Sequence, residues 1–237
     1  MKMRLFTLVA AMLLAAPAAH AADACTTLEA RTAAFEPDLK AAFELMKARD
    51  IAGARKYLPK LEAYFAAIPA TMPQPARCGA EVAVFDYLQY LRFTELTGAG
   101  KTVPGYPAGT KFTFKLLDLN ALAYAVGWLN YESQNFDKAL AAYTKGLLIA
   151  PGDHDLSSEY VATLMQQKNY APIISFADTY LSGDTDISPK ARASMMGGKA
   201  IAQTLTGNKA GGRATLEAAV KLDPQNQTLK DLLAQWQ

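Results

Sequence analysis

The chain has 237 residues, of which 24 are Lys or Arg and 22 are Asp or Glu, so its formal net charge is only +2. A balance this close to zero excludes the strong basic field that would concentrate nucleic acid or anionic lipid on the surface. We therefore expect no nucleic-acid partner, and the length suits one sizeable domain or a short repeat array.

The first residues have the pattern of a secretory leader. Two basic residues precede an apolar run of 12 residues, 5–16, and Ala19-His20-Ala21 then places small residues where a signal peptidase cleaves. The run is too short to cross a bilayer, which takes roughly 20 residues. We predict a signal peptide at residues 1–22, cleaved near Ala21 or Ala22. The mature chain, without a membrane span, is then expected in the periplasm or outside a bacterial cell.

The sequence contains two cysteines, Cys25 and Cys78. Export would place them in an oxidising compartment, where thiols tend to pair, so we predict a disulfide between them. Two alternatives stay open, namely lipidation of Cys25 after cleavage just before it, and free thiols. Asp23 fits a lipidation signal poorly. Because the chain has no Cys-x-x-Cys motif, a thiol-redox site is not expected.

In the N-terminal half, apolar residues recur at spacings of three and four, which predicts helices and no convincing strand. Prolines and glycines mark the boundaries between these helices. The expected elements are helices at 28–49 with a break at Pro37, from a turn at Asp50 to about Ile68, at 79–96 and at 112–134, with a Gly/Pro-rich connection at 98–110. We take residues 23–110 as an N-terminal helical region.

The C-terminal half, residues 111–237, is regular. The turn at Asn135-Phe136 recurs at Asn169-Tyr170, and a third turn follows at Asn208-Lys209 after a slightly longer interval. A period of roughly 34 residues with two helices per unit indicates a repeat architecture, because neither helix of a unit can bury its apolar stripe alone. A last short helix, 228–236, is expected to cover the open end.

The unit from Asn120 to Asp153 carries residues with the spacing of a known repeat motif: Ala123, Gly127, Asn135-Phe136, Ala139, Tyr143 and Pro151. With these residues it resembles the tetratricopeptide repeat family. Segments 154–187 and 193–226 resemble it more weakly, and a divergent unit is possible after Asp50. The resemblance implies an all-α fold, a solenoid of antiparallel helix pairs in a right-handed superhelix, with a divergent helical N-terminal half.

The resemblance also implies a concave groove, lined by the first helix of each pair, that holds a peptide or a partner helix. The groove-facing residues would be Tyr124, Trp128, Tyr131 and Glu132. The three aromatic residues share one helix face, and Trp and Tyr dominate interface hot spots. The alternative is that this face packs under the 98–110 connection or against a neighbouring helix. The basic residues that clamp a peptide's terminal carboxylate in some family members are absent here.

No set of residues points to catalysis. A single histidine, His154, follows the leader, and residues 98–102 lack the first glycine of a phosphate-binding loop. We therefore expect no enzyme, no cofactor and no metal, and predict an exported module that binds a partner protein or peptide.

Two other functions stay open. One is a small-molecule-binding or hydrolytic protein with a site beside the 98–110 connection, where long irregular segments are often functional. The residues of that site would be Tyr106, Lys111, Lys115, Glu81 and Asp86. The other is a structural envelope protein that associates with itself as a homo-oligomer.

Overall fold

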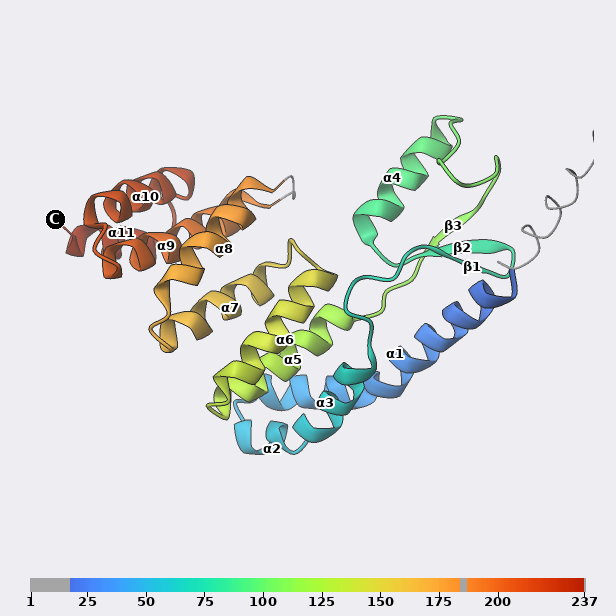
Figure 1. Ribbon diagram of the computed structural model, residues 1–237, viewed down its shortest axis with the longest axis horizontal. Coiled ribbons are helices and arrows are strands. Elements are labelled where there is room, and N and C mark those ends of the chain that lie inside the picture. The colour runs from blue at the N-terminus through green and yellow to red at the C-terminus, as the bar shows by residue number, and fades with distance from the viewer. Residues whose placement is uncertain (1–17, 184–186, 237) are drawn as a thin grey trace, which may run out of the picture. The chain divides into compact units, whose positions relative to one another are not determined.

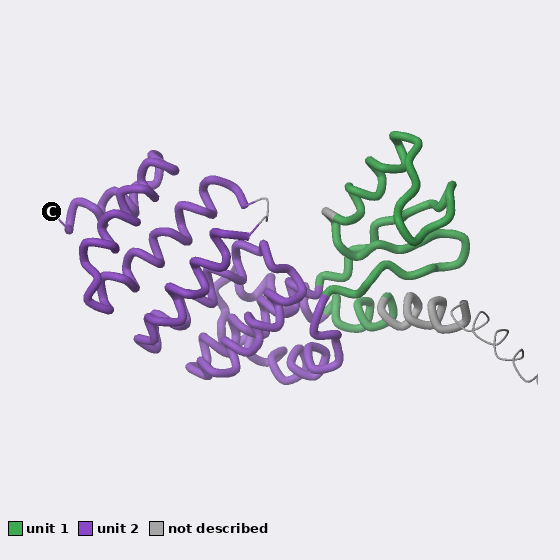
Figure 2. Tube along the Cα trace, turned by 45° about the horizontal axis from the view of Figure 1, so that its top comes forward, with its two compact units in different colours: residues 1–37, 72–118 green, residues 38–71, 119–237 purple. Residues whose placement is uncertain are grey.

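The computed structural model describes residues 18–183 and 187–236, with side chains from Glu29 onward apart from Leu88. In this part of the chain it contains eleven helices and three short strands (Figure 1). The chain divides into two compact units (Figure 2). Unit 1 comprises residues 1–37 and 72–118, and unit 2 comprises residues 38–71 and 119–237.

Unit 1 contains a small three-stranded sheet in the order β1-β2-β3. Strand β1 (Ala76–Cys78) pairs antiparallel with β2 (Glu81–Val84), and β2 pairs in parallel with β3 (Phe112–Phe114). Helix α4 (Tyr87–Gly98) packs on β3 through aromatic rings, with 4.9 Å between the centroids of Phe93 and Phe112.

The expectation of helices alone was wrong for this unit. The helix predicted from residue 79 begins only at Tyr87, after β2, and the helix predicted from residue 112 begins at Leu119, after β3. Residues 82–85 are all buried, so the strand shows no alternation of apolar and polar residues. A short apolar run of this kind cannot be distinguished from a helix by its period.

Unit 2 begins within a long helix, α1 (Ala18–Lys47), which contains Pro37 and continues through it. The predicted break at Pro37 was therefore wrong. The second predicted helix is divided in two, α2 (Ile51–Arg55), capped by the Asp50 carboxylate, and α3 (Leu58–Ala67).

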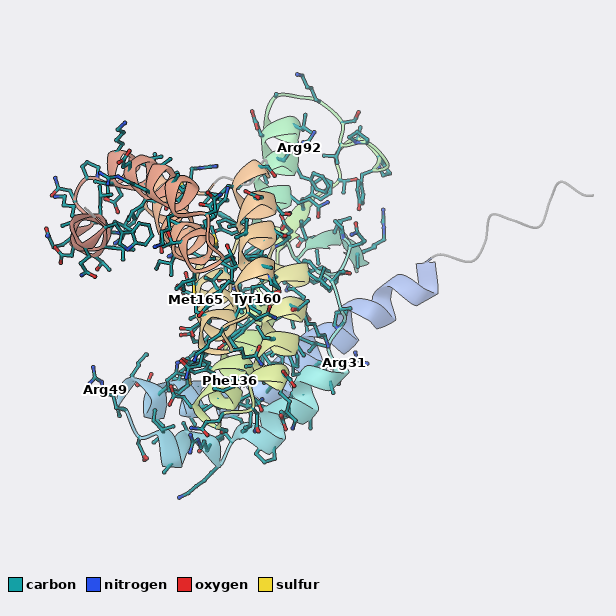
Figure 3. All side chains as sticks on the ribbon, turned by 60° about the vertical axis from the view of Figure 1, so that its left-hand side comes forward. Arg31, Arg49, Arg92, Phe136, Tyr160 and Met165 are labelled. Atoms are coloured by element: carbon teal, nitrogen blue, oxygen red, sulfur yellow. The ribbon has the colours of Figure 1, made fainter. Side chains whose placement is uncertain are left out.

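The rest of unit 2 is a series of antiparallel helix pairs followed by a short terminal helix (Figure 1). The pairs are α5 (Leu119–Glu132) with α6 (Phe136–Ile149), α7 (His154–Gln166) with α8 (Tyr170–Ser182), and α9 (Pro189–Leu205) with α10 (Lys209–Leu222); α11 (Gln227–Gln235) ends the chain. The predicted all-α class, a solenoid of helix pairs, is confirmed. Tyr160 and Met165 of α7 pack against the core that this helix forms with α8 and α9 (Figure 3).

Two glycines explain how closely α5 and its neighbours approach. A Cβ atom on Gly127 would lie 2.3 Å from Cε1 of Tyr143, whose side chain is fully buried. A Cβ atom on Gly146 would lie 2.8 Å from Cβ of Ala123. Gly127, one of the motif residues, therefore lies where the paired helices approach closely, and the packing requires a glycine at position 146 as well.

Helices α2 and α3 are joined to the repeats rather than to unit 1. The Lys145 ammonium on α6 donates to the carbonyls of Phe65 and Ile68, at 2.8 and 2.9 Å, at the C-terminal end of α3. Cations favour this end of a helix, where the last carbonyls lack partners. Residues 38–71, which the sequence analysis placed in the N-terminal helical region, therefore belong to unit 2, the compact unit that contains the repeats.

Most of the predicted leader, residues 1–17, lies outside the described residues, as does the side chain of Cys25. The signal peptide and the Cys25–Cys78 bridge accordingly stay predictions. Among the helices that the structure describes, none has both the length and the apolar content that crossing a bilayer requires.

Candidate functional site

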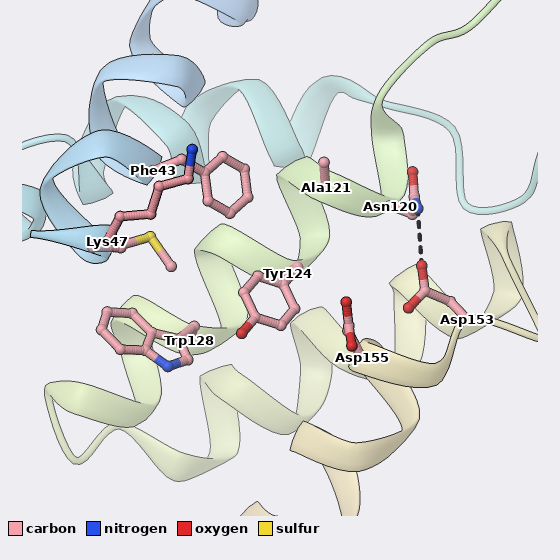
Figure 4. Close-up of a pocket in the computed structure, with 9 residues that line it drawn as sticks. Phe43, Lys47, Asn120, Ala121, Tyr124, Trp128, Asp153 and Asp155 are labelled. Carbon is pink, nitrogen blue, oxygen red and sulfur yellow. Dashed lines mark hydrogen bonds between the residues drawn. The ribbon is translucent and has the colours of Figure 1, made fainter. Parts of the chain in front are cut away.

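A pocket of about 450 Å³ lies in unit 2 between α1, α5 and the start of α7 (Figure 4). It is lined by Phe43, Met46, Lys47, Asn120, Ala121, Tyr124, Trp128, Asp153 and Asp155. Apolar and aromatic groups occupy one side of it and carboxylates the other. This combination of an apolar wall with a few convergent polar groups is typical of binding sites.

Two of the predicted groove residues, Tyr124 and Trp128, form the α5 side of the pocket, and both are half-buried. They are four residues apart, so they lie one turn apart on the same helix face. The Tyr124 ring stacks on Phe43 of α1, with 6.2 Å between centroids and 22° between ring planes. Tyr124 thus both packs against a neighbouring helix and lines the pocket, which combines the two predicted alternatives.

The other two predicted residues, Tyr131 and Glu132, do not line this pocket. The Tyr131 ring packs edge-on against Phe136 at the turn of its own helix pair, with 5.5 Å between centroids. The backbone carbonyl of Glu132 accepts a hydrogen bond from the Arg55 guanidinium of α2. The structure therefore brings Tyr124 and Trp128 together and places Tyr131 and Glu132 at the end of α5.

The carboxylate of Asp153 is fixed by two hydrogen bonds. It caps α7 by accepting from the backbone N–H of Leu156 at 3.0 Å, and it accepts from the Asn120 amide of α5 at 2.9 Å (Figure 4). Asp155 lies in the first turn of α7, where its carboxylate is exposed and favoured by the helix dipole.

Glu159 lies one turn further along α7 and is half-buried. Burial raises the pKa of its carboxyl group, and the charges of Asp155 and Glu132 raise it further. Burial, followed by the charge of Glu159, raises the pKa of Tyr124 to about 12. Tyr124 therefore keeps its proton at neutral pH and faces a group of carboxylates as a hydrogen-bond donor.

Tyr143 of α6 is fully buried behind this wall of α5, and its hydroxyl has no hydrogen-bond partner among the described residues. Burial raises its pKa, and the charges of Glu159, Tyr124 and Tyr131 add to the effect.

Replacing Tyr143 with phenylalanine is expected to raise the free energy of unfolding by about 1 kcal/mol, because the change removes a buried hydroxyl without a partner and keeps the ring. Urea denaturation followed by circular dichroism measures the change. A loss of stability of similar size would show that the hydroxyl has a partner in the folded protein.

Of the nine residues that line the pocket, sequence reasoning named only Tyr124 and Trp128. Asp155 had a usable signal, because it follows Ala121 by one period of the repeat and so occupies the equivalent groove position of the next unit. Glu159 lies on the same helix. Phe43 had no signal, because α1 is not part of a repeat.

Three of the residues proposed for a hydrolytic site make structural contacts within unit 1. Tyr106 packs on Phe112, with 5.2 Å between centroids, Lys115 pairs with Glu29 at 3.0 Å, and Asp86 caps α4. A hollow of about 660 Å³ does lie beside the connection. Its lining contains no carboxylate: Gln89, Arg92, Phe93, Leu96, Lys101, Thr102, Val103 and Pro104. Within the described ranges, no group of three His, Cys, Asp or Glu residues could hold a metal ion.

No protein-family model and no curated protein matches the sequence. Among solved structures, the chain is similar to the first TPR of Spaghetti (RPAP3) bound to the HSP90 peptide SRMEEVD, with 15% identity and a TM-score of 0.42. The match covers 49% of this chain and 89% of that chain. The description of the fold rests on the helix pairs and the packing of Gly127 and Tyr143 given above.

Proposed function

We propose that this chain is an exported protein-interaction module whose pocket between α1, α5 and α7 holds part of a partner protein or peptide. The observation that carries the proposal is the half-buried pair Tyr124 and Trp128 on the α5 side of the pocket. Half-buried aromatic side chains in a concave surface give a partner a large contact area, and they lose little conformational freedom when it binds.

The chemistry of the pocket favours binding over catalysis. Its lining consists of apolar, aromatic, amide and carboxylate side chains with one lysine, and includes no Ser, Cys or His that could serve as an activated nucleophile. Asp153 is held by the N-terminus of α7 and by Asn120, so it fixes the shape of the site.

Export rests on the leader pattern at residues 1–22 and on the two cysteines, Cys25 and Cys78, which suit a disulfide in an oxidising compartment. The partner is accordingly expected in the periplasm or outside the cell.

The proposal predicts that a photo-crosslinking amino acid at position 121, in the pocket, gives a saturable adduct with a partner when the full chain is expressed with its leader in bacteria. The variant Trp128→Ala should weaken this partner's binding by a factor of about 10 or more, because truncating an aromatic hot spot costs about 2 kcal/mol. Adduct yield against expression level measures the effect.

The controls are a crosslinker at the exposed residue Lys190 and the variant Trp236→Phe, which alters the other tryptophan. An adduct from position 121 that persists unchanged in Trp128→Ala, or one that position 190 gives equally well, would contradict binding in the pocket.

A further inference from the structure

The rim of the pocket carries more negative than positive charge. Asp153 and Asp155 line it, and Glu159 follows on the next turn of α7. The only cation in the lining, Lys47, forms a hydrogen-bonded ion pair with Glu44 at 2.9 Å, and both side chains are largely exposed. Asp153 and Asp155 themselves form no ion pair with another described residue, so a ligand that enters the pocket meets carboxylates without a salt-bridge partner.

Two carboxylates on α7, Asp155 and Glu159, have no ion-pair partner. In the described part of the chain, none of the ion pairs includes either of them. Burial raises the pKa of Glu159, and the charges of Asp155 and of Glu132, at the end of α5, raise it further. A half-buried carboxylate without a cationic partner is unfavourable, and a bound cation would remove that penalty.

The aromatic wall suits the same kind of ligand. The faces of Tyr and Trp rings attract cations, and arginine in particular stacks on them while its planar guanidinium donates to carboxylates. Figure 4 shows the Tyr124 side chain between Trp128 and Asp155, so an aromatic face and a carboxylate are offered side by side. Lysine, a compact point charge, would use the carboxylates but stack less well.

We propose that the pocket selects a peptide segment of the partner that carries arginine, with the guanidinium stacked on Tyr124 or Trp128 and donating to Asp155 and Glu159. This inference rests on the proposed function, that the pocket binds a peptide or protein. It adds the chemistry of the occupant, a cationic segment recognised by charge complementarity and by stacking.

The test uses the full chain with Trp236→Phe, which leaves Trp128 as the only tryptophan and makes it an optical probe within the pocket. The probes are the blocked peptide GSLRSLRSG and three versions with Lys, Gln or Glu in place of its arginines. We expect the arginine peptide to shift the Trp128 emission saturably and the lysine peptide to bind more weakly. The glutamine peptide should bind at least about tenfold more weakly, since charged hydrogen bonds are lost, and the glutamate peptide should give no shift.

Two variants connect this result to the carboxylates. Asp155→Asn and Glu159→Gln should each reduce the affinity for the arginine peptide by a factor of about 5 to 10, with the glutamine peptide unaffected. Asp231→Asn, an exposed carboxylate on α11, is the control and should change neither affinity. Glu159→Gln should fold normally, because a raised pKa means that folding disfavours the charged form of this side chain, and glutamine is neutral.

The possible results separate the two proposals. If the glutamine or glutamate peptide binds as tightly as the arginine peptide, or if both carboxylate variants keep full affinity for arginine, the charge selection is overturned and the pocket remains a peptide site. The proposed function fails as well if two results coincide. One is that no peptide changes the Trp128 emission. The other is that the crosslinker at position 121 gives either no adduct or an adduct that Trp128→Ala does not reduce.

Discussion

Replacing Gly127 with alanine is expected to lower the free energy of unfolding by about 3 kcal/mol, because inserting a methyl group into a packed core forces the surrounding groups apart. The new Cβ atom would lie 2.3, 2.6 and 2.7 Å from three ring carbons of Tyr143. That ring is fully buried and cannot swing into solvent. Urea denaturation followed by circular dichroism gives the change in free energy.

Helix propensity alone would make Gly127→Ala stabilising, so the sign of the change in the free energy of unfolding shows whether the contact with Tyr143 exists. Alanine in the interior of an exposed helix is favoured over glycine by about 1 kcal/mol. Gly98, the last residue of α4, serves as the control because nothing lies within 4 Å of a Cβ atom added there. Gly98→Ala should be neutral or slightly stabilising. If Gly127→Ala were equally harmless, the close contact between α5 and Tyr143 would not exist in solution.

A double variant identifies the cause. Tyr143→Leu alone removes ring atoms from the core and should cost about 3 kcal/mol, in the range of large-to-small core changes. In the Tyr143→Leu background, Gly127→Ala should cost much less, because the ring that it would strike is gone. Neighbouring residues that share a contact are expected to be non-additive in this way. If the losses of stability from Gly127→Ala and Tyr143→Leu were instead additive in the double variant, contact with the Tyr143 ring would not be the cause of the Gly127→Ala loss.

Gly127 and Tyr143 show why the repeats could be predicted from the sequence. A stack of helix pairs imposes a small residue wherever two helices meet closely, and this requirement recurs at a fixed period. The last helix, expected at 228–236 as a cover for the open end, is observed at Gln227–Gln235. No such rule applied to β2, whose buried residues have no alternation to distinguish them from a helix.

The candidate site could be predicted only where it belongs to a repeat. Tyr124 and Trp128 share a helix face, so their spacing placed them together. Their neighbour Phe43 comes from α1, far from Tyr124 in the sequence, and only the folded chain brings the two rings together. That Glu159 has no ion-pair partner among the described residues is likewise a property of the fold, because a chain of balanced charge gives no indication of which carboxylates stay unpaired.

Asn130 is a second residue whose role the sequence did not indicate. Its side chain is fully buried in α5, where the amide donates to Glu62 of α3 at 3.1 Å and to the carbonyl of Val126 at 3.0 Å. The same oxygen of Glu62 accepts from Lys138 of α6 at 3.2 Å. Three helices are thereby joined through one carboxylate.

Asn130→Ala is expected to lower the free energy of unfolding by about 2 kcal/mol, because a hydrogen bond to a charged group contributes about 1.5–3 kcal/mol. The orphaned Oδ1 atom of Asn130 offsets part of this loss when it is removed. Urea denaturation again measures the change, with Lys138→Met as the matched control. Its ion pair with Glu62 is mostly exposed and should contribute less than about 1 kcal/mol.

The comparison of Asn130→Ala with Glu62→Ala and the double variant shows what holds α3 against the repeats. If the Asn130 amide and the Glu62 carboxylate act as a pair, the double variant should lose about 1 kcal/mol less than the sum of the single losses. The link should then also protect α2 and α3 from proteolysis, since helices that open locally are cleaved first. If Asn130→Ala loses no more than Lys138→Met, α3 is held chiefly by its apolar contacts and by Lys145 at its C-terminal end.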